Sequence, residues 1–148
     1  MFKFTPKLNQ ETKNIIDNRE QLKELVNCYG SPLNILFPNV MNKNISDFKE
    51  ILKKHNLSGK IYYAHKCNKS NSFLKQALQN QINVDVASLE ELKSALSNGF
   101  TGDRIEATGP KNDEFIILGI RHNIVFNVDN LEEIKKINYF KEKIQTKN

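Results

Sequence analysis

One repeating pattern constrains this chain of 148 residues more than any other feature. Short apolar runs start near Ile61, Asn83, Arg104 and Ile124, at intervals of 22, 21 and 20 residues, and a helical pattern follows each run. Strands connected by helices at this spacing lie parallel, because a parallel neighbour requires a crossover and a helix provides it. The sequence therefore predicts an α/β fold with four consecutive βα units.

Two architectures repeat this unit, the doubly wound sheet and the eight-fold barrel. In doubly wound nucleotide-binding folds the first turn from strand to helix usually carries clustered glycines. The corresponding turn here reads CNKSNS and contains no glycine. The pattern therefore favours a partial (β/α)8, or TIM, barrel of about four βα units.

The residues before the repeats are expected to form separate segments. Residues 1–14 are interpreted as a polar N-terminal tail, and residues 15–37 as a helix closed by Gly30 and followed by a strand, PLNILF. A longer helix is expected from about Asn39 to His55, because its apolar residues recur at helical spacing. Residues 38–148 would then form the N-terminal half of a barrel.

Composition and charge exclude several classes of function. The net charge of +5 comes from scattered lysines without a basic stripe or interleaved aromatic residues, so no nucleic-acid partner is expected. No apolar run reaches the roughly 18 to 20 residues needed to cross a membrane, and no secretory signal is recognisable, which indicates the cytoplasm. Cys28 and Cys67 are interpreted as free thiols, because their spacing fits neither a disulfide framework nor a zinc site.

Functional residues are expected where strands end and helices begin. Lys66 lies near the end of the first predicted strand, and alternation would place it on one face with Tyr62 and Ala64. Burial disfavours the charged form of an amine, and a neutral amine can attack an aldehyde to form a Schiff base. The alternative interpretation is an ordinary lysine that extends into water.

Two carboxylates follow on the next unit. Asp85 lies between two valines, where a charge is costly unless it is paired, and Lys66 is the expected partner. A purely structural ion pair would leave the same pattern. In SLEE, Ser88 and Glu91 match a capping box in which the glutamate reaches back to the Ser88 amide, and this role requires no catalysis.

Other polar residues have simpler interpretations. His65 and His122 are expected to be packing or surface histidines. TGPK, which begins at Thr108, is expected to form a turn, although its amides could also bind an anion.

The order YGSPLNILF, IYYAHKCN, VDVASLEEL and GFTGDRIEATGPK resembles the N-terminal part of the pyridoxal-phosphate enzymes that decarboxylate ornithine, arginine or diaminopimelate. These fold-type III enzymes share their barrel with alanine racemase. The resemblance covers about residues 29–134. AHKCN, in place of the commoner AVKCN or AVKAN, indicates a less characterised bacterial branch.

The resemblance implies a cofactor and a set of site residues. The cofactor is pyridoxal 5'-phosphate, and Lys66 matches the lysine that forms a Schiff base with it. Ala64 matches a small residue beside the cofactor, Asp85 a carboxylate that lines the same site, and Glu91 a glutamate near the lysine. The implied activity is that of an amino-acid decarboxylase, a carbon–carbon lyase.

The resemblance also implies that half of the barrel, the phosphate-binding loop and the C-terminal β domain are absent from these 148 residues. One hypothesis is an enzyme component that acts on an amino-acid substrate as a homo-oligomer or with a complementary C-terminal chain. The other is a catalytically inactive half-barrel, or an assembly subunit without activity of its own. By itself the chain is expected to bind the cofactor weakly and to decarboxylate no amino acid.

Overall fold

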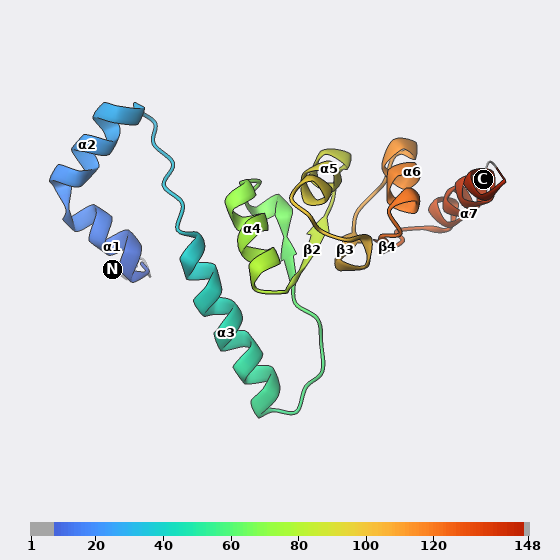
Figure 1. The fold of residues 1–148 in the computed structure, drawn as a ribbon, viewed down its shortest axis with the longest axis horizontal. Helices are drawn as coiled ribbons and strands as arrows, with labels where there is room; N and C mark the ends of the chain where they lie inside the picture. The colour runs from blue at the N-terminus through green and yellow to red at the C-terminus, as the bar shows by residue number, and fades with distance from the viewer. Residues whose placement is uncertain (1–7, 147–148) are drawn as a thin grey trace, which may run out of the picture. The chain divides into compact units, whose positions relative to one another are not determined.

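The computed structural model describes residues 8–146, and the chain divides into two compact units, Met1–Phe37 and Pro38–Asn148 (Figure 1). The second unit contains α3 (Pro38–Lys54), β1 (Tyr62–Ala64), η1 (His65–Cys67), α4 (Asn71–Gln79), β2 (Asn83–Val86), α5 (Leu89–Ser97), η2 (Gly102–Arg104), β3 (Ile105–Ala107), α6 (Asp113–Arg121), β4 (Val125–Phe126) and α7 (Leu131–Gln145). The four predicted βα units are confirmed.

The four strands form one parallel sheet in the order β1-β2-β3-β4. Consecutive strands are neighbours, so α4, α5 and α6 each provide the crossover between two adjacent strands, as in one half of a barrel. Within the described residues, β1 and β4 each pair with a single strand and form the two edges of the sheet.

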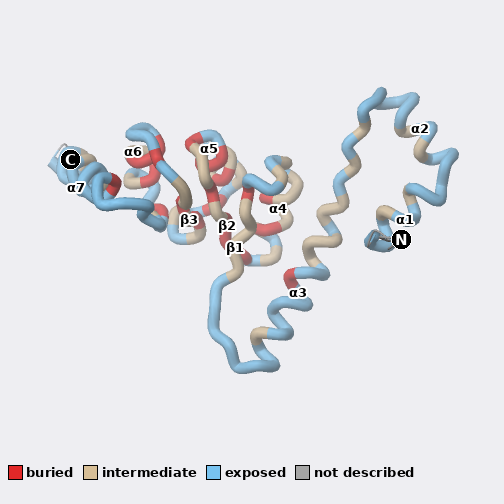
Figure 2. Tube along the Cα trace, turned by 180° about the vertical axis from the view of Figure 1, so that it is seen from behind, coloured by how far each residue is buried: buried red, intermediate tan, exposed pale blue. Residues whose placement is uncertain are grey.

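One face of the sheet packs against helices. Val84 and Val86 of β2 and Ile105 and Ala107 of β3 are completely buried. The helices complete this core with Leu74, Ala77, Leu92, Ala95 and Phe115. Burial of each large apolar side chain contributes about 1.5–3 kcal/mol, which makes this interface the main source of stability. Figure 2 shows the buried residues gathered in the strands and in α4 to α6.

The other face of the sheet, called here the open face, carries a different row of side chains. The strand register places Ala64, Asp85, Glu106 and Val125 side by side on the four strands. Because side chains alternate along a strand, this row points away from the buried valines of β2. Val125 is 44% exposed, so helices do not cover the open face at β4.

Each of the four helices that follow a strand begins at a side-chain cap. Ser70, Ser88, Asn112 and Asn130 each accept a hydrogen bond from a backbone N–H in the first turn of α4, α5, α6 or α7. These caps satisfy donors that a helix otherwise leaves unpaired. They therefore define where each strand-to-helix loop ends.

The first unit differs from its sequence prediction. It contains two helices, α1 (Gln10–Asp17) and α2 (Arg19–Tyr29), instead of a tail and one helix. Asn18 separates them, because its backbone is not helical and its side chain accepts a hydrogen bond from Gln21 N–H. Gly30 ends α2 with a φ of 84°, as predicted. Residues 1–7 of the predicted tail lie outside the described residues.

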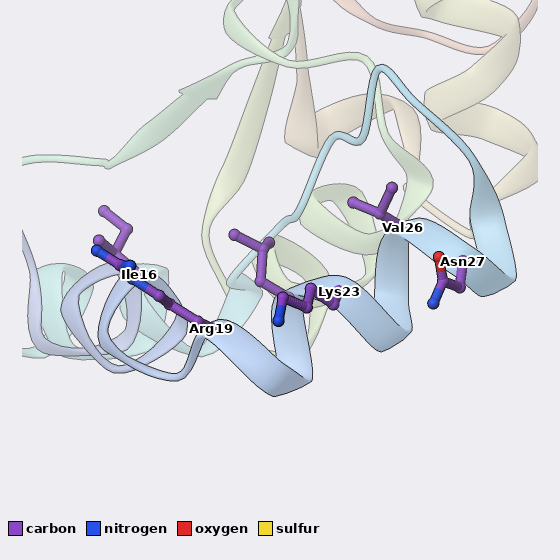
Figure 3. Close-up of a pocket in the computed structure, with 6 residues that line it drawn as sticks. Ile16, Arg19, Lys23, Val26 and Asn27 are labelled. Carbon is purple, nitrogen blue, oxygen red and sulfur yellow. The ribbon is translucent and has the colours of Figure 1, made fainter.

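The strand predicted at 32–37 is wrong, because these residues belong to no helix or strand. A strand needs a neighbour for its backbone hydrogen bonds, and the described part of this unit contains no other strand. The unit has an apolar hollow of about 580 Å³ on α1 and α2, lined by Ile16, Arg19, Leu22, Lys23, Val26 and Asn27 (Figure 3). None of the predicted site residues lines it.

Candidate functional site

Lys66 lies at the carboxyl end of the sheet, but not on a strand. Strand β1 ends at Ala64, and His65–Cys67 form the 3₁₀ turn η1, closed by Asn68 N–H donating to His65 O at 3.2 Å. The predicted alternation therefore fails after Ala64, and Lys66 is exposed on the turn instead of having its stem inside the sheet. Among the described residues, its amine forms no hydrogen bond or ion pair.

The segment that carries Lys66 is fixed by its neighbours. Tyr63 Oη donates to Asn68 O at 2.8 Å, and Asn68 Oδ1 accepts from Ser70 N–H at 3.0 Å. Burial, together with a smaller effect of Cys67, raises the pKa of Tyr63 to about 12, so the phenol remains a hydrogen-bond donor at neutral pH. The exposed amine is thus presented by a hydrogen-bonded loop.

Asp85 and Ala64 are register partners on the open face of adjacent strands. Asp85 Oδ1 accepts a hydrogen bond from Thr108 Oγ1 at 2.6 Å. The predicted ion pair between Asp85 and Lys66 is not formed, since Lys66 has left the strand while Thr108 follows β3 on the same face. Thr108 lies two residues after Glu106, the register partner of Asp85 on β3. This spacing is the signal that could have identified Thr108 as the partner of Asp85.

Glu91 is buried, with 3% of its surface exposed, and connects two segments of the site. Ser88 Oγ accepts from Glu91 N–H at 3.2 Å, which confirms the predicted cap. The Glu91 carboxylate, however, does not bind the Ser88 amide. Oε2 accepts from Ala87 N–H at 2.9 Å, and Oε1 pairs with Lys69 Nζ at 3.0 Å, so Glu91 holds the loop that follows Lys66.

The two histidines of the prediction have different environments. His65 is only 1% exposed and lies 6.4 Å from the Tyr63 ring, whereas His122 is exposed after α6. Burial lowers the pKa of His65, an effect that Lys69 strengthens and that Glu91 and a backbone hydrogen bond with Asn68 oppose. His65 is therefore a packing residue with a neutral ring at neutral pH.

A second lysine–glutamate pair was missed by the sequence prediction. Lys111 Nζ is completely buried and donates to Gly109 O at 2.6 Å, Asn127 O at 2.7 Å and Glu133 Oε1 at 2.7 Å. TGPK thus forms an irregular loop that bends at Gly109, and its lysine points inward and connects the loops after β3 and β4 to α7. The amine has three donors and uses all of them.

Three other features of the described residues do not indicate a competing functional site. A smaller hollow of about 310 Å³ adjoins Gly59, Ile61 and Ile82, at the amino ends of β1 and β2 and away from Lys66. Both cysteines are free and exposed. From residue 8 to residue 146, no helix combines the length and apolar character needed to cross a membrane.

Comparison with known proteins gives one matching family. The family model described as "Pyridoxal-dependent decarboxylase, pyridoxal binding domain" matches residues 39–147. The uncharacterized protein y4yA of Sinorhizobium fredii is 37% identical over 110 residues, which cover 74% of this chain and 24% of that protein. Diaminopimelate decarboxylase of Bacillus subtilis is 30% identical over 112 residues, which cover 74% of this chain and 26% of that enzyme.

Solved structures give the same result. The crystal structure of diaminopimelate decarboxylase from M. jannaschii superposes with a TM-score of 0.71 at 29% sequence identity, covering 82% of this chain and 30% of that one. The chain thus spans about a quarter of the two curated relatives and less than a third of the solved structure.

Proposed function

This chain belongs to the pyridoxal-binding domain family of the pyridoxal-dependent decarboxylases, and from that premise we propose that Lys66 carries pyridoxal 5'-phosphate through a covalent bond from its amine. The observation that supports the proposal is the exposed Lys66 amine, which has no partner within residues 8–146 and lies on a fixed turn at the carboxyl end of the sheet. Attachment joins this nitrogen to the cofactor's aldehyde carbon and releases water.

The surroundings of the three nearby lysines favour Lys66 as the reactive one. Lys111 Nζ is buried and donates to three acceptors, so its lone pair is unavailable. Lys69 Nζ pairs with the buried Glu91 carboxylate at 3.0 Å, so this amine already has a partner. Lys66 has neither restraint among the described residues, and water or an aldehyde can reach it.

We propose that the open face holds the aromatic ring of the cofactor near Ala64 and Asp85. Ala64 has a small side chain and leaves space on the sheet. Asp85, its register partner, is held by Thr108 and presents a fixed negative charge next to that space. Glu91 is proposed to act at one remove, by holding Lys69 and so the loop that carries Lys66.

We propose that these residues serve the decarboxylation of an amino acid in the complete protein. The cofactor, when bound, supplies a ring that accepts the electron pair left behind when a carboxylate departs. The Lys66 amine, once free of the cofactor, would hold or move a proton at Nζ. Asp85 contributes orientation and a fixed negative charge. The choice of substrate amino acid is left open by the residues described here.

The test is borohydride reduction of the 148-residue chain with pyridoxal 5'-phosphate, followed by peptide mass mapping. We expect the label to concentrate on Lys66, and to disappear from that peptide in Lys66→Met. The matched control is Lys75→Met, which removes another exposed lysine and should leave the labelling of Lys66 unchanged. Labelling spread over the exposed lysines would refute the proposal and favour a half-barrel without cofactor chemistry.

A further inference from the structure

His65 is the one residue beside Lys66 whose side chain is both polar and almost completely buried. Its Nδ1 is the only buried side-chain nitrogen or oxygen in residues 8–146 that lacks a hydrogen-bond partner. A buried nitrogen without a hydrogen-bond partner destabilises the folded chain, whereas an apolar side chain at the same position would carry no such penalty. The fold therefore carries a cost at the residue that precedes the proposed cofactor lysine.

Four residues act on the His65 ring or lie beside it. Glu91 of α5 and Lys69 of the loop after η1 act on it electrostatically with opposite signs, a backbone hydrogen bond with Asn68 favours its protonated form, and Tyr63 of β1 lies beside it. Tyr63 stays uncharged, because its pKa is about 12. The electrostatic balance at the ring thus depends on the Glu91–Lys69 pair, in which the lysine side chain is 65% exposed and the glutamate side chain is buried.

One buried carboxylate therefore has two candidate cations, the Lys69 ammonium and a protonated His65. While His65 is neutral, Glu91 binds Lys69 at 3.0 Å and holds the loop after η1. A proton on the buried ring needs a negative partner, and Glu91 is the available carboxylate. Lys69, being mostly exposed, is hydrated by water when it leaves Glu91, so the loop then loses this contact.

We propose that His65 is a positioning residue for Lys66: the neutral ring leaves Glu91 to hold the loop through Lys69, and protonation of the ring draws Glu91 away and loosens the turn. The effect on the reactivity of Lys66 rests on the proposed function, whereas the competition of Lys69 and protonated His65 for Glu91 does not. It predicts that acid reduces the reactivity of Lys66 through His65.

The direction of the pH effect follows from burial. The pKa of His65 is lowered in the folded chain relative to its usual 6.5, so the unfolded chain takes up the proton first as the pH falls. The closed turn is therefore fully stable above about pH 6.5, and its stability decreases as the pH falls through the lowered pKa.

The first experiment requires no cofactor and measures the pKa of His65 by NMR titration of its ring. We expect Lys69→Met to raise this pKa, because the competing cation is removed, and Glu91→Gln to lower it, because the favourable carboxylate is lost. His55, which is exposed, is the internal control and should titrate identically in all variants. An unchanged His65 pKa in both variants would overturn the competition.

The second experiment compares borohydride labelling of Lys66 at neutral pH and at about pH 5. The ratio of the two yields should be several-fold larger in the wild-type chain than in His65→Val, which cannot be protonated; His65→Gln provides a polar alternative if the valine variant fails to fold. His55→Gln should behave as wild type.

Equal ratios in wild type and His65→Val would refute the link between His65 and Lys66. Absence of selective labelling in the wild type at neutral pH would instead refute the proposed function of Lys66. The NMR titration of His65 would still decide whether Lys69 and protonated His65 compete for Glu91.

Discussion

The buried pair of Lys111 and Glu133 gives the sharpest prediction about stability. Lys111→Met keeps the side chain's length but leaves the Glu133 carboxylate, 5% exposed, without its cation, and Gly109 O and Asn127 O without their donor. Removing one partner of a buried pair costs about 3–5 kcal/mol. A typical domain has about 5–15 kcal/mol of unfolding free energy, so this loss would be a large share.

Urea unfolding followed by circular dichroism measures the effect. With a denaturant dependence of about 2 kcal/mol per molar, the midpoint should fall by about 1.5–2.5 M. Adding Glu133→Leu should restore much of the loss, because an apolar pair replaces the uncompensated charge. Lys136→Met, which removes one partner of the exposed pair with Asp113, is the matched control and should leave the midpoint unchanged. A midpoint for Lys111→Met equal to that of the control would refute the reasoning.

Two further predictions concern the stability of the fold, one beside the site and one at the amino end of the sheet. Tyr63→Phe should lower the unfolding free energy by about 1 kcal/mol through the lost bond to Asn68 O, and should remove a tyrosine that titrates near pH 12, visible in the absorbance of tyrosinate. In the wild type, this raised pKa makes stability fall as the pH rises from about 10 to 12. Gly102→Ala should lower the urea midpoint strongly, because a Cβ there would collide with the backbone carbonyl of His122, whereas Gly59→Ala, with open space around it, should not.

The apolar periodicity predicted where strands start better than where they end. Strands β1 and β2 begin within one residue of the expected positions. The apolar run in the sequence marks the strand start because the residues of a buried strand are themselves apolar. The end of β1 depends on how far its backbone pairs with β2, and that pairing stops at Ala64. Lys66, two residues later, was therefore assigned a face of a strand that it does not belong to.

The polar contacts of the site were predicted only in part. The Ser88 cap was found because a cap is a local interaction between neighbouring residues. The pair of Lys111 and Glu133 was missed because a lysine in a turn is usually interpreted as solvated. A signal was present in the repeats, because Lys69 and Lys111 each precede a helix cap by one residue. Each binds a glutamate of the next βα unit, Glu91 or Glu133, and the sequence separation between lysine and glutamate is the same in both pairs.

That repeated arrangement also explains why the three lysines at one end of the sheet differ in chemistry. Lys69 and Lys111 each bind a buried glutamate that is placed by a helix cap, so their positions are those of structural cations. Lys66 lies three residues before Lys69, on the turn that this contact helps to hold, and has no counterpart pair among the described residues. A lysine attacks an aldehyde only through a free lone pair. The fold therefore leaves the Lys66 amine without a carboxylate partner among the described residues while it pairs Lys69 and Lys111 with glutamates, and the selectivity of labelling measures that difference directly.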